Sequence, residues 1–103
     1  MSSDSQSGVE VLDRLYEVIE SRRGGDPKES RTARLFKRGV KKISQKVGEE
    51  ATETVIAALS ESDERLVSEC ADLIYHLLVL LAAREIAPAQ VYAELAARAG
   101  QPK

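Results

Sequence analysis

Cysteine, proline and aromatic residues are scarce in this sequence, and each scarcity excludes a class of protein. The single cysteine, Cys70, excludes an intrachain disulfide and fits a reducing compartment, so we expect a cytoplasmic protein. Only three prolines and four aromatic residues, beside 43% hydrophobic and 31% charged residues, indicate a helix-rich domain rather than a β-sandwich or a disordered chain. The formal net charge of −2 gives no reason to expect nucleic acid or an anionic membrane as a partner.

Long apolar runs are also missing. Residues 1–8 are polar and lack the apolar stretch of a targeting signal, so we expect a disordered N-terminal tail there. The most apolar run, 71–83, contains Asp72 and His76 and is too short to cross a bilayer, which predicts a buried helix and no membrane partner. The remainder, 9–100, is the size of a single domain, and so short a chain favours sharing its core with a second copy.

The spacing of the apolar residues predicts four helices, no strand and therefore an all-α fold. The predicted helices cover approximately 9–22, 30–59, 64–84 and 88–98. Ser30 or Thr32 can cap the second helix, while Pro88 suits the first turn of the fourth and Gly100 its end. The third helix is apolar over the widest arc, so we expect it to be the most buried element.

Two glycines interrupt the second predicted helix. Gly39 and Gly48 each cost roughly 1 kcal/mol against alanine inside a helix. They indicate either a break near Gly39 or places where a ligand or a neighbouring helix comes close.

Carboxylates border the apolar stripe of this helix. Because a helix advances about 100° per residue, Glu50 falls within roughly 20° of Ile43, inside the stripe edge. Glu53 lies about 60° further round, and Glu49 lies beyond it. The same flank carries Gly39, Lys42 and Lys46, one and two turns earlier.

The third helix repeats the pattern. Glu69 lies roughly 40° from Leu73, at the margin of the apolar arc, and Asp72 and His76 share its flank. A short turn joins the second and third helices, so we expect them to pack antiparallel and bring the two margins together. The acidic residues predicted to converge are Glu50, Glu53, Glu69 and Asp72.

Four carboxylates at a half-buried seam repel one another unless a cation lies between them. Mg²⁺, or alternatively Mn²⁺, suits them because these hard ions take carboxylate oxygens and keep places for water and phosphate oxygens. Zinc suits them less, since the seam offers one histidine and no cysteine cluster.

Each of these features also has a simpler interpretation. Glutamates spaced as E-x-x-E are usually solvated helix faces, and Lys46 can pair with Glu49 or Glu50 on the surface. Cys70 is most simply a small core residue, because no base pattern surrounds it. His76 is more often a core histidine than a metal ligand, and Tyr75 a packing residue.

The segments Ser30–Phe36, Lys46–Val55 and Glu69–Leu78 resemble the phosphoribosyl-ATP pyrophosphohydrolases, and the resemblance extends from about Val9 to Tyr92. These enzymes of histidine biosynthesis are MazG-like all-α nucleotide pyrophosphohydrolases. The pattern E-x-x-E followed by E-x-x-D places the superfamily's acidic residues at Glu50, Glu53, Glu69 and Asp72.

The resemblance implies a four-helix bundle completed by dimerisation, and Mg²⁺-dependent hydrolysis of the α–β phosphoanhydride of phosphoribosyl-ATP. It implies metal ligation by the four acidic residues just named and a catalytic role for Glu49, Glu50 or Glu53. It implies phosphate binding by Arg34, Lys42, Lys46 or Lys37, with Gly39 allowing close approach of the substrate. The chain has no room for a fused cyclohydrolase domain, so we expect the stand-alone form.

Two alternatives stay open. One is a house-cleaning enzyme that hydrolyses ordinary or damaged nucleoside triphosphates, although the segment 30–46 favours phosphoribosyl-ATP. The other is a helical dimer that acts as an interaction module and carries solvated carboxylates.

Overall fold

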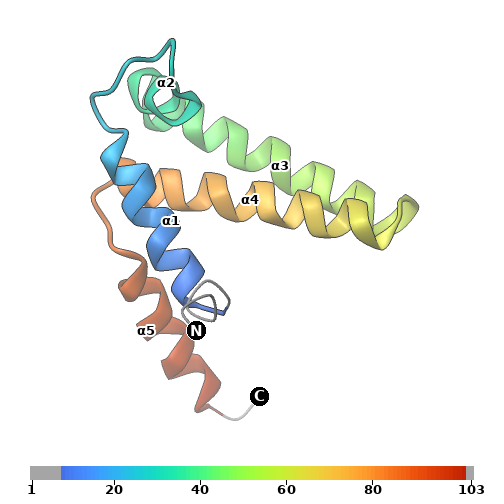
Figure 1. The fold of residues 1–103 in the computed structure, drawn as a ribbon. Helices are drawn as coiled ribbons and strands as arrows, with labels where there is room; N and C mark the ends of the chain where they lie inside the picture. The colour runs from blue at the N-terminus through green and yellow to red at the C-terminus, as the bar shows by residue number, and fades with distance from the viewer. Residues whose placement is uncertain (1–7, 102–103) are drawn as a thin grey trace, which may run out of the picture.

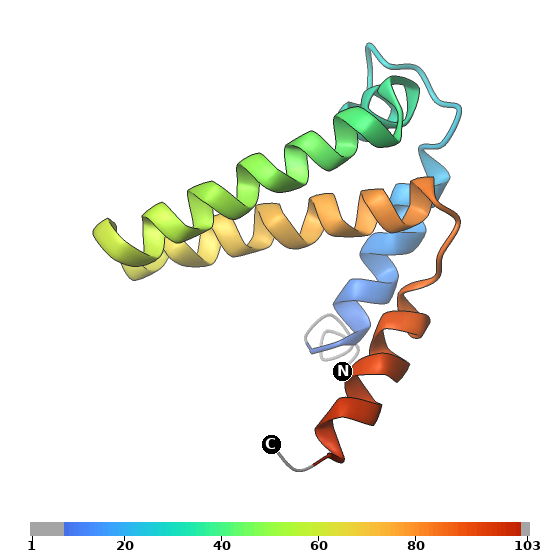
Figure 2. The ribbon, with the colours of Figure 1, turned by 180° about the vertical axis from the view of Figure 1, so that it is seen from behind.

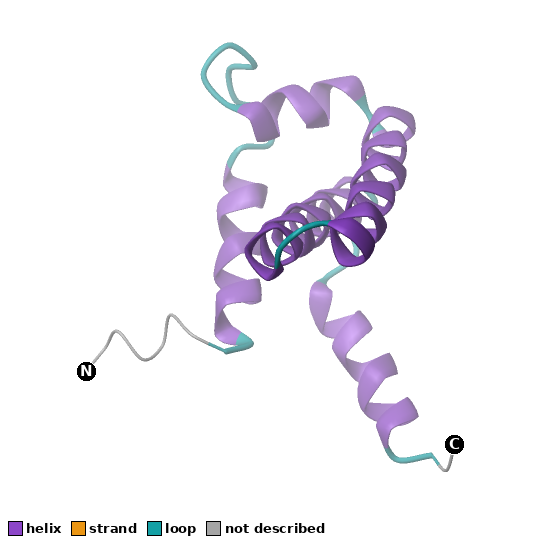
Figure 3. Ribbon diagram, turned by 90° about the vertical axis from the view of Figure 1, so that its right-hand side faces the viewer, coloured by secondary structure: helices purple, strands orange, loops and turns teal. Residues whose placement is uncertain are grey.

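The fold is all-α, as predicted, in a computed structural model that describes residues 8–101. The described residues form five α-helices and no strand (Figure 1; Figure 3). The helices are α1 (Glu10–Ser21), α2 (Arg31–Arg38), α3 (Val40–Ser60), α4 (Asp63–Ala83) and α5 (Pro88–Ala99). The predicted N-terminal tail, 1–8, lies outside the described residues except for Gly8.

The fold is built on a long antiparallel hairpin of α3 and α4. The two helices lie side by side in both ribbon views, joined by the short connection between Ser60 and Asp63 (Figures 1 and 2). The side chain of Ser62 caps α4 by accepting a hydrogen bond from the backbone N–H of Arg65.

The second predicted helix is two helices, so the prediction of four helices is wrong by one break. Ser30 caps α2 by accepting a hydrogen bond from the backbone N–H of Ala33. Gly39 ends α2 and precedes α3 with φ 90° and ψ 177°, a backbone conformation essentially confined to glycine. This glycine therefore turns α2 away from the direction of α3 (Figure 3).

The apolar core lies where α1 and α2 meet the C-terminal half of α4. Its fully buried members are Ile19, Leu35, Ile43, Leu78, Val79 and Ala82. The hydroxyl of Tyr16 donates a hydrogen bond to the carbonyl of Ile86, 2.9 Å away, which ties α1 to the loop before α5. The guanidinium of Arg23 lies 4.6 Å from the ring centroid of Phe36 and donates to the carbonyl of Ala82, joining α1, α2 and α4.

Helix α4 contains more buried residues than any other described helix, in line with the expectation from its wide apolar arc. Its length and composition would also allow it to cross a membrane. It carries Glu69, His76 and other polar residues against α2 and α3, which is the make-up of a core helix. Its side chains Val67, Ile74 and Leu77 are nevertheless exposed, so one face of α4 has no cover within the described residues.

Candidate active site

Three carboxylates come together between α3 and α4. One oxygen from each of Glu50, Glu69 and Asp72 lies within 4.8 Å of the others. Glu50 is 7% exposed and Glu69 is 5% exposed, whereas Asp72 lies closer to the solvent. The inward lean of Glu50 and Glu69 that helical geometry predicted is therefore present.

Two oxygens of this carboxylate cluster have no hydrogen-bond partner within the described residues: Oε1 of Glu50 and Oε1 of Glu69. A buried carboxylate oxygen without a partner costs free energy, because it loses its hydrogen bonds to water. Hard divalent cations coordinate such oxygens, with Mg²⁺ and Mn²⁺ as the usual choices in phosphoryl chemistry. The donor set thus fits the predicted cation, because every ligand atom that it offers is a carboxylate oxygen.

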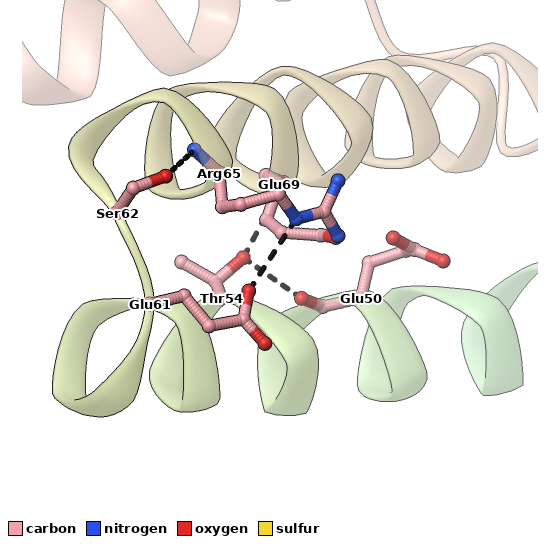
Figure 4. A network of polar contacts seen from close by, with 6 residues as sticks. All are labelled: Glu50, Thr54, Glu61, Ser62, Arg65 and Glu69. Carbon is pink, nitrogen blue, oxygen red and sulfur yellow. Dashed lines mark hydrogen bonds and ion pairs between the residues drawn. The ribbon is translucent and has the colours of Figure 1, made fainter.

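Two further residues fix the position of the cluster (Figure 4). The hydroxyl of Thr54 lies 2.8 Å from the carbonyl oxygen of Glu50 and 3.3 Å from that of Glu69, so it joins α3 to α4 at this level. Arg65, one turn before Glu69, donates from Nη2 to Oε2 of Glu69 at 2.5 Å. The cluster therefore rests on rigid helix backbone and on a charged hydrogen bond.

The electrostatics of the cluster are those of crowded acids. Burial raises the pKa of Glu69, and the guanidinium of Arg65 opposes that rise. The charges of Glu53, Glu50 and Asp72 then add to it, because each disfavours a further negative charge on Glu69. A bound cation would offset the repulsion from these three carboxylates.

The two remaining glutamates of α3 lie outside the cluster. Glu53 is exposed, yet it is near enough for its charge to raise the pKa of Glu69. Glu49 points to the surface, where Oε2 accepts from Gln45 at 2.9 Å and Oε1 pairs with Lys46 at 3.2 Å. The hydrogen bond from Gln45 and the pairing with Lys46 hold the pKa of Glu49 below its usual value. Of the two predicted pairs of Lys46, the one with Glu49 is therefore present.

A basic groove lies beside α3 and includes three of the residues predicted to bind phosphate. This groove, of about 180 Å³, is lined by Arg31, Arg34, Leu35, Arg38, Lys42 and Lys46. Lys46 precedes Glu50 by one helical turn, so the groove and the carboxylate cluster share α3. Arg34 is also anchored to the loop, because Nη1 donates to the carbonyl of Pro27 at 2.6 Å.

Gly39 and Lys37 line a different and larger hollow, of about 480 Å³, together with Phe36 and residues of the loop before α2 such as Gly24 and Pro27. Space is open around Gly39, since a Cβ there would meet no atom within 4 Å. The need for glycine at this position therefore comes from its backbone angles. The smaller groove is the better candidate for phosphate binding, because five of its six lining side chains are cationic.

His76 lies between the carboxylate cluster and the basic groove and contacts one residue of each. Its Nδ1 lies 2.8 Å from the carbonyl of Asp72 and its Nε2 lies 3.3 Å from Nη2 of Arg31. A carbonyl only accepts and a guanidinium only donates, so Nδ1 carries the proton and Nε2 accepts. Both ring nitrogens are thereby used, which leaves His76 as a buried structural residue, the simpler of the two sequence interpretations.

Sequence reasoning missed four residues of this region: Arg31, Arg38, Thr54 and Arg65. A signal for Arg65 existed, because it lies four residues before Glu69, the spacing of helical ion pairs. Arg31 and Arg38 required the break at Gly39, which sets the direction of α2. Cys70 is half-buried and free, as a packing residue would be.

An all-α chain that places buried carboxylates beside a groove of arginines and lysines has the construction of the all-α hydrolases that act on nucleotide phosphoanhydrides. The acidic residues gather on the hairpin of α3 and α4, and the cations lie on α2 and on the first turns of α3.

The chain belongs to the phosphoribosyl-ATP pyrophosphohydrolase family, whose family model matches residues 12–99. A phosphoribosyl-ATP pyrophosphatase of Paramagnetospirillum magneticum is 57% identical over 100 residues, 97% of this chain and 88% of the relative. That of Azospirillum brasilense is 52% identical over 97% of this chain and 89% of the relative. That of Erythrobacter litoralis is 58% identical over 92 residues, 89% of this chain and 88% of the relative. The predicted enzyme family is confirmed, and neither alternative function is favoured.

Proposed function

We propose that this chain hydrolyses phosphoribosyl-ATP to phosphoribosyl-AMP and pyrophosphate, a step of histidine biosynthesis, in the cytoplasm and with Mg²⁺ as cofactor. Family membership supports the substrate. The observation that carries the proposed site is the pair of buried, unpartnered oxygens on Glu50 and Glu69, facing a third carboxylate across the hairpin. Mn²⁺ offers the same preference for oxygen and is the natural substitute in experiments.

Glu50, Glu69 and Asp72 are the residues that would hold the cation, and Glu53 lies at the edge of the same site. When bound, a divalent ion neutralises phosphate charge and lowers the pKa of water. The helix hairpin contributes a fixed arrangement of the carboxylates, because Thr54 joins the two backbones at their level. Fixed donors keep the cost of reorganisation low during the reaction.

The basic groove would bind the phosphates of the substrate. Its arginines offer planar, bidentate donors for phosphate oxygens, and Lys42 and Lys46 add compact charges. Phosphoribosyl-ATP carries a triphosphate and a separate ribose phosphate, so several cationic side chains are needed. Phosphates bound in the groove would bring the α–β bridge of the substrate close to the carboxylate cluster and its water.

In the reaction, a water oxygen attacks phosphorus at the α–β bridge, the bridging P–O bond breaks, and pyrophosphate leaves. The water's proton needs a carboxylate outside the cluster, which leaves Glu49 and Glu53. Hydrogen bonds from Gln45 and Lys46 lower the pKa of Glu49 and make it the weaker base. Glu53 forms no ion pair among the described residues, so we assign the proton to it.

A second copy of the chain completes the proposed enzyme. Large apolar side chains are exposed along the hairpin, namely Val55, Ile56, Leu59, Val67, Ile74 and Leu77. Contiguous apolar surface on a chain this small marks a contact with another protein surface. A homodimer covers this surface without any partner of different sequence.

The decisive experiment measures pyrophosphate release from phosphoribosyl-ATP in the presence of Mg²⁺. We expect the native chain to be active and Glu50→Gln to be slower by at least about 100-fold, the scale of losing one preorganised electrostatic group. Glu53→Gln should lose more activity than Glu49→Gln. Deoxynucleoside triphosphates, assayed in parallel, should be turned over poorly.

Glu94→Gln is the matched control, because Glu94 is an exposed glutamate on α5 and far along the chain from the cluster. It should retain native activity, and circular dichroism should show that every variant is helical. An inert native chain would refute the enzyme assignment. Full activity in Glu50→Gln would remove the carboxylate cluster from the mechanism.

A further inference from the structure

Arg65 contacts the carboxylate cluster from its side. Its Nη2 donates to Oε2 of Glu69 at 2.5 Å, while Oε1 of the same carboxylate is buried and has no partner among the described residues (Figure 4). The two oxygens of Glu69 are therefore unequal: one is bound by a guanidinium and the other is available to a ligand. A carboxylate held in this way cannot rotate freely.

Arg65 is itself held by two contacts. Its Nε lies 3.4 Å from Oε1 of Glu61, and its backbone N–H donates to the side chain of Ser62 at 3.2 Å. Both partners belong to the connection between α3 and α4, at the end of the hairpin (Figure 4). A line of contacts thus runs from Glu61 through Arg65 to Glu69.

The ion pair between Arg65 and Glu69 joins an exposed side chain to a buried one. The Arg65 side chain is 55% exposed, so it contributes little to the core, whereas the Glu69 side chain is 6% exposed. Ion pairs at helical spacing on a surface add little to stability. Ligating carboxylates, in contrast, are commonly oriented by a second hydrogen bond, and loss of such a partner weakens metal binding.

We propose that Arg65 is a positioning residue for the divalent cation: by holding Oε2 of Glu69, it presents Oε1 to the ion. The inference rests on the proposed cation site. Arg65 touches neither substrate nor reacting atoms in this role.

If Arg65 competed with the metal ion instead, its removal would change metal affinity in the opposite direction. If Arg65 were a competing cation that must leave before the metal binds, its removal would strengthen metal binding. If Arg65 orients Glu69, its removal weakens metal binding, although one positive charge is lost. The sign of the change therefore decides between the two roles.

The test is the dissociation constant of Mn²⁺, measured by isothermal titration calorimetry on the full chain without substrate. We expect Arg65→Gln to raise it by about 10-fold or more, the scale for loss of an outer hydrogen-bond partner of a ligand. Arg65→Lys keeps the charge but cannot contact Glu61 and Glu69 with one planar fork, so its value should fall in between. Glu61→Gln should show a smaller change in the same direction.

Arg98→Gln is the matched control, because Arg98 pairs with Glu94 at 3.0 Å and four residues apart on α5, like Arg65 with Glu69. It should bind Mn²⁺ like the native chain. Activity gives a second readout: Arg65→Gln should need more Mg²⁺ for half-maximal rate, recover most of its rate at high Mg²⁺, and keep the native KM for phosphoribosyl-ATP. A change in protein packing would not be rescued by Mg²⁺.

Unchanged or tighter Mn²⁺ binding by Arg65→Gln, with an active native enzyme, would overturn the role of Arg65 and leave the proposed function intact. Absence of Mn²⁺ binding by the native chain would overturn both this role and the cation site.

Discussion

At the scale of single residues, the glutamates of the site differ in their burial and in their partners. Glu50 and Glu69 are buried against one another, and only Glu69 has a cationic partner in Arg65. Glu49, directly before Glu50 in α3, is instead on the surface with a lowered pKa. Neighbouring glutamates in one helix thus have different chemistry, because burial and partners differ while residue type does not.

The raised pKa of Glu69 predicts a pH dependence of stability in the metal-free protein. Since folding raises this pKa above its usual 4.5, the folded state binds the proton more tightly than the unfolded state does. The contribution of Glu69 is therefore fully present below the unfolded pKa and is lost as pH rises through the folded pKa. Glu69→Gln should remove this loss. Its stability relative to the native chain should therefore be higher at neutral pH than at pH 4.

The measurement is thermal unfolding across this pH range with a chelator present, comparing Glu69→Gln with native protein. Addition of Mn²⁺ should stabilise the native chain at neutral pH and the variant far less, since binding to the folded state alone raises stability. A variant that follows the native pH dependence throughout would contradict the burial of a charged Glu69.

At the scale of helices, two glycines of similar sequence context have different roles. Gly39 adopts φ 90° and ψ 177° between α2 and α3, whereas Gly48 lies inside α3 with open space around it. Gly39→Ala should lower the free energy of unfolding by about 1–3 kcal/mol, because this conformation is strained for any residue with a Cβ. Gly48→Ala should raise it by as much as about 1 kcal/mol, because alanine favours the helix.

Chemical denaturation measures the free energy of unfolding of both variants. The comparison is valid if both unfold with the same dependence on denaturant concentration as the native chain. A stabilising Gly39→Ala would mean that the break between α2 and α3 is absent in solution. A destabilising Gly48→Ala would show that another surface approaches this glycine closely.

A hydrogen bond between two hydroxyls joins α2 to α4. The hydroxyls of Thr32 and Tyr75 lie 2.5 Å apart, beside the contact between Arg31 and His76. Tyr75→Phe and Thr32→Val should each lower stability by about 1 kcal/mol, the typical net worth of one hydrogen bond. Because they share one bond, the double variant should lose about as much as either alone, which a double-mutant cycle would measure.

Additive losses in that cycle would show that the two hydroxyls do not bond to each other. Tyr16→Phe is a matched control, since it removes a different tyrosine hydrogen bond, to the carbonyl of Ile86, and should add independently to either change.

At the scale of the whole molecule, the chain has more apolar surface than its own helices can cover. Val67 is 69% exposed and Leu59 is 82% exposed, at the end of a hairpin that extends away from α1 and α5 (Figure 2). The proposed homodimer predicts a mass of twice 11.3 kDa in solution. Val67→Asp should shift the chain toward the monomer, because a buried charge without a partner destabilises an interface.

Light scattering after size-exclusion chromatography measures the mass of each variant. Leu95→Asp, on the exposed face of α5, is the control for the added charge and should leave the mass unchanged. A native chain that is monomeric at all concentrations would remove the dimer from the proposed enzyme.

Much of the fold follows from the sequence, because helix geometry is local. The 3.6-residue period locates α1, α4 and α5 to within a few residues, although it merged α2 and α3 into one helix. It also predicts that Glu50 and Glu69 lean inward, as they do. Residue type limited the cap of the second predicted helix to Ser30 or Thr32, and the structure uses Ser30. Gly39 was a recognised candidate for a break, although its propensity alone did not separate a break from a close approach.

The family, too, follows from the resemblance of sequence segments, whereas the separate roles of the site residues do not. Long-range packing decides that Asp72 joins Glu50 and Glu69 while Glu53 lies outside, that Arg31 reaches the buried Nε2 of His76, and that the groove includes Arg38. The physical reason is that periodicity specifies the direction of a side chain on its own helix. Which atom it meets depends on how the helices are turned against each other, and that direction is set by Gly39 and by the hairpin.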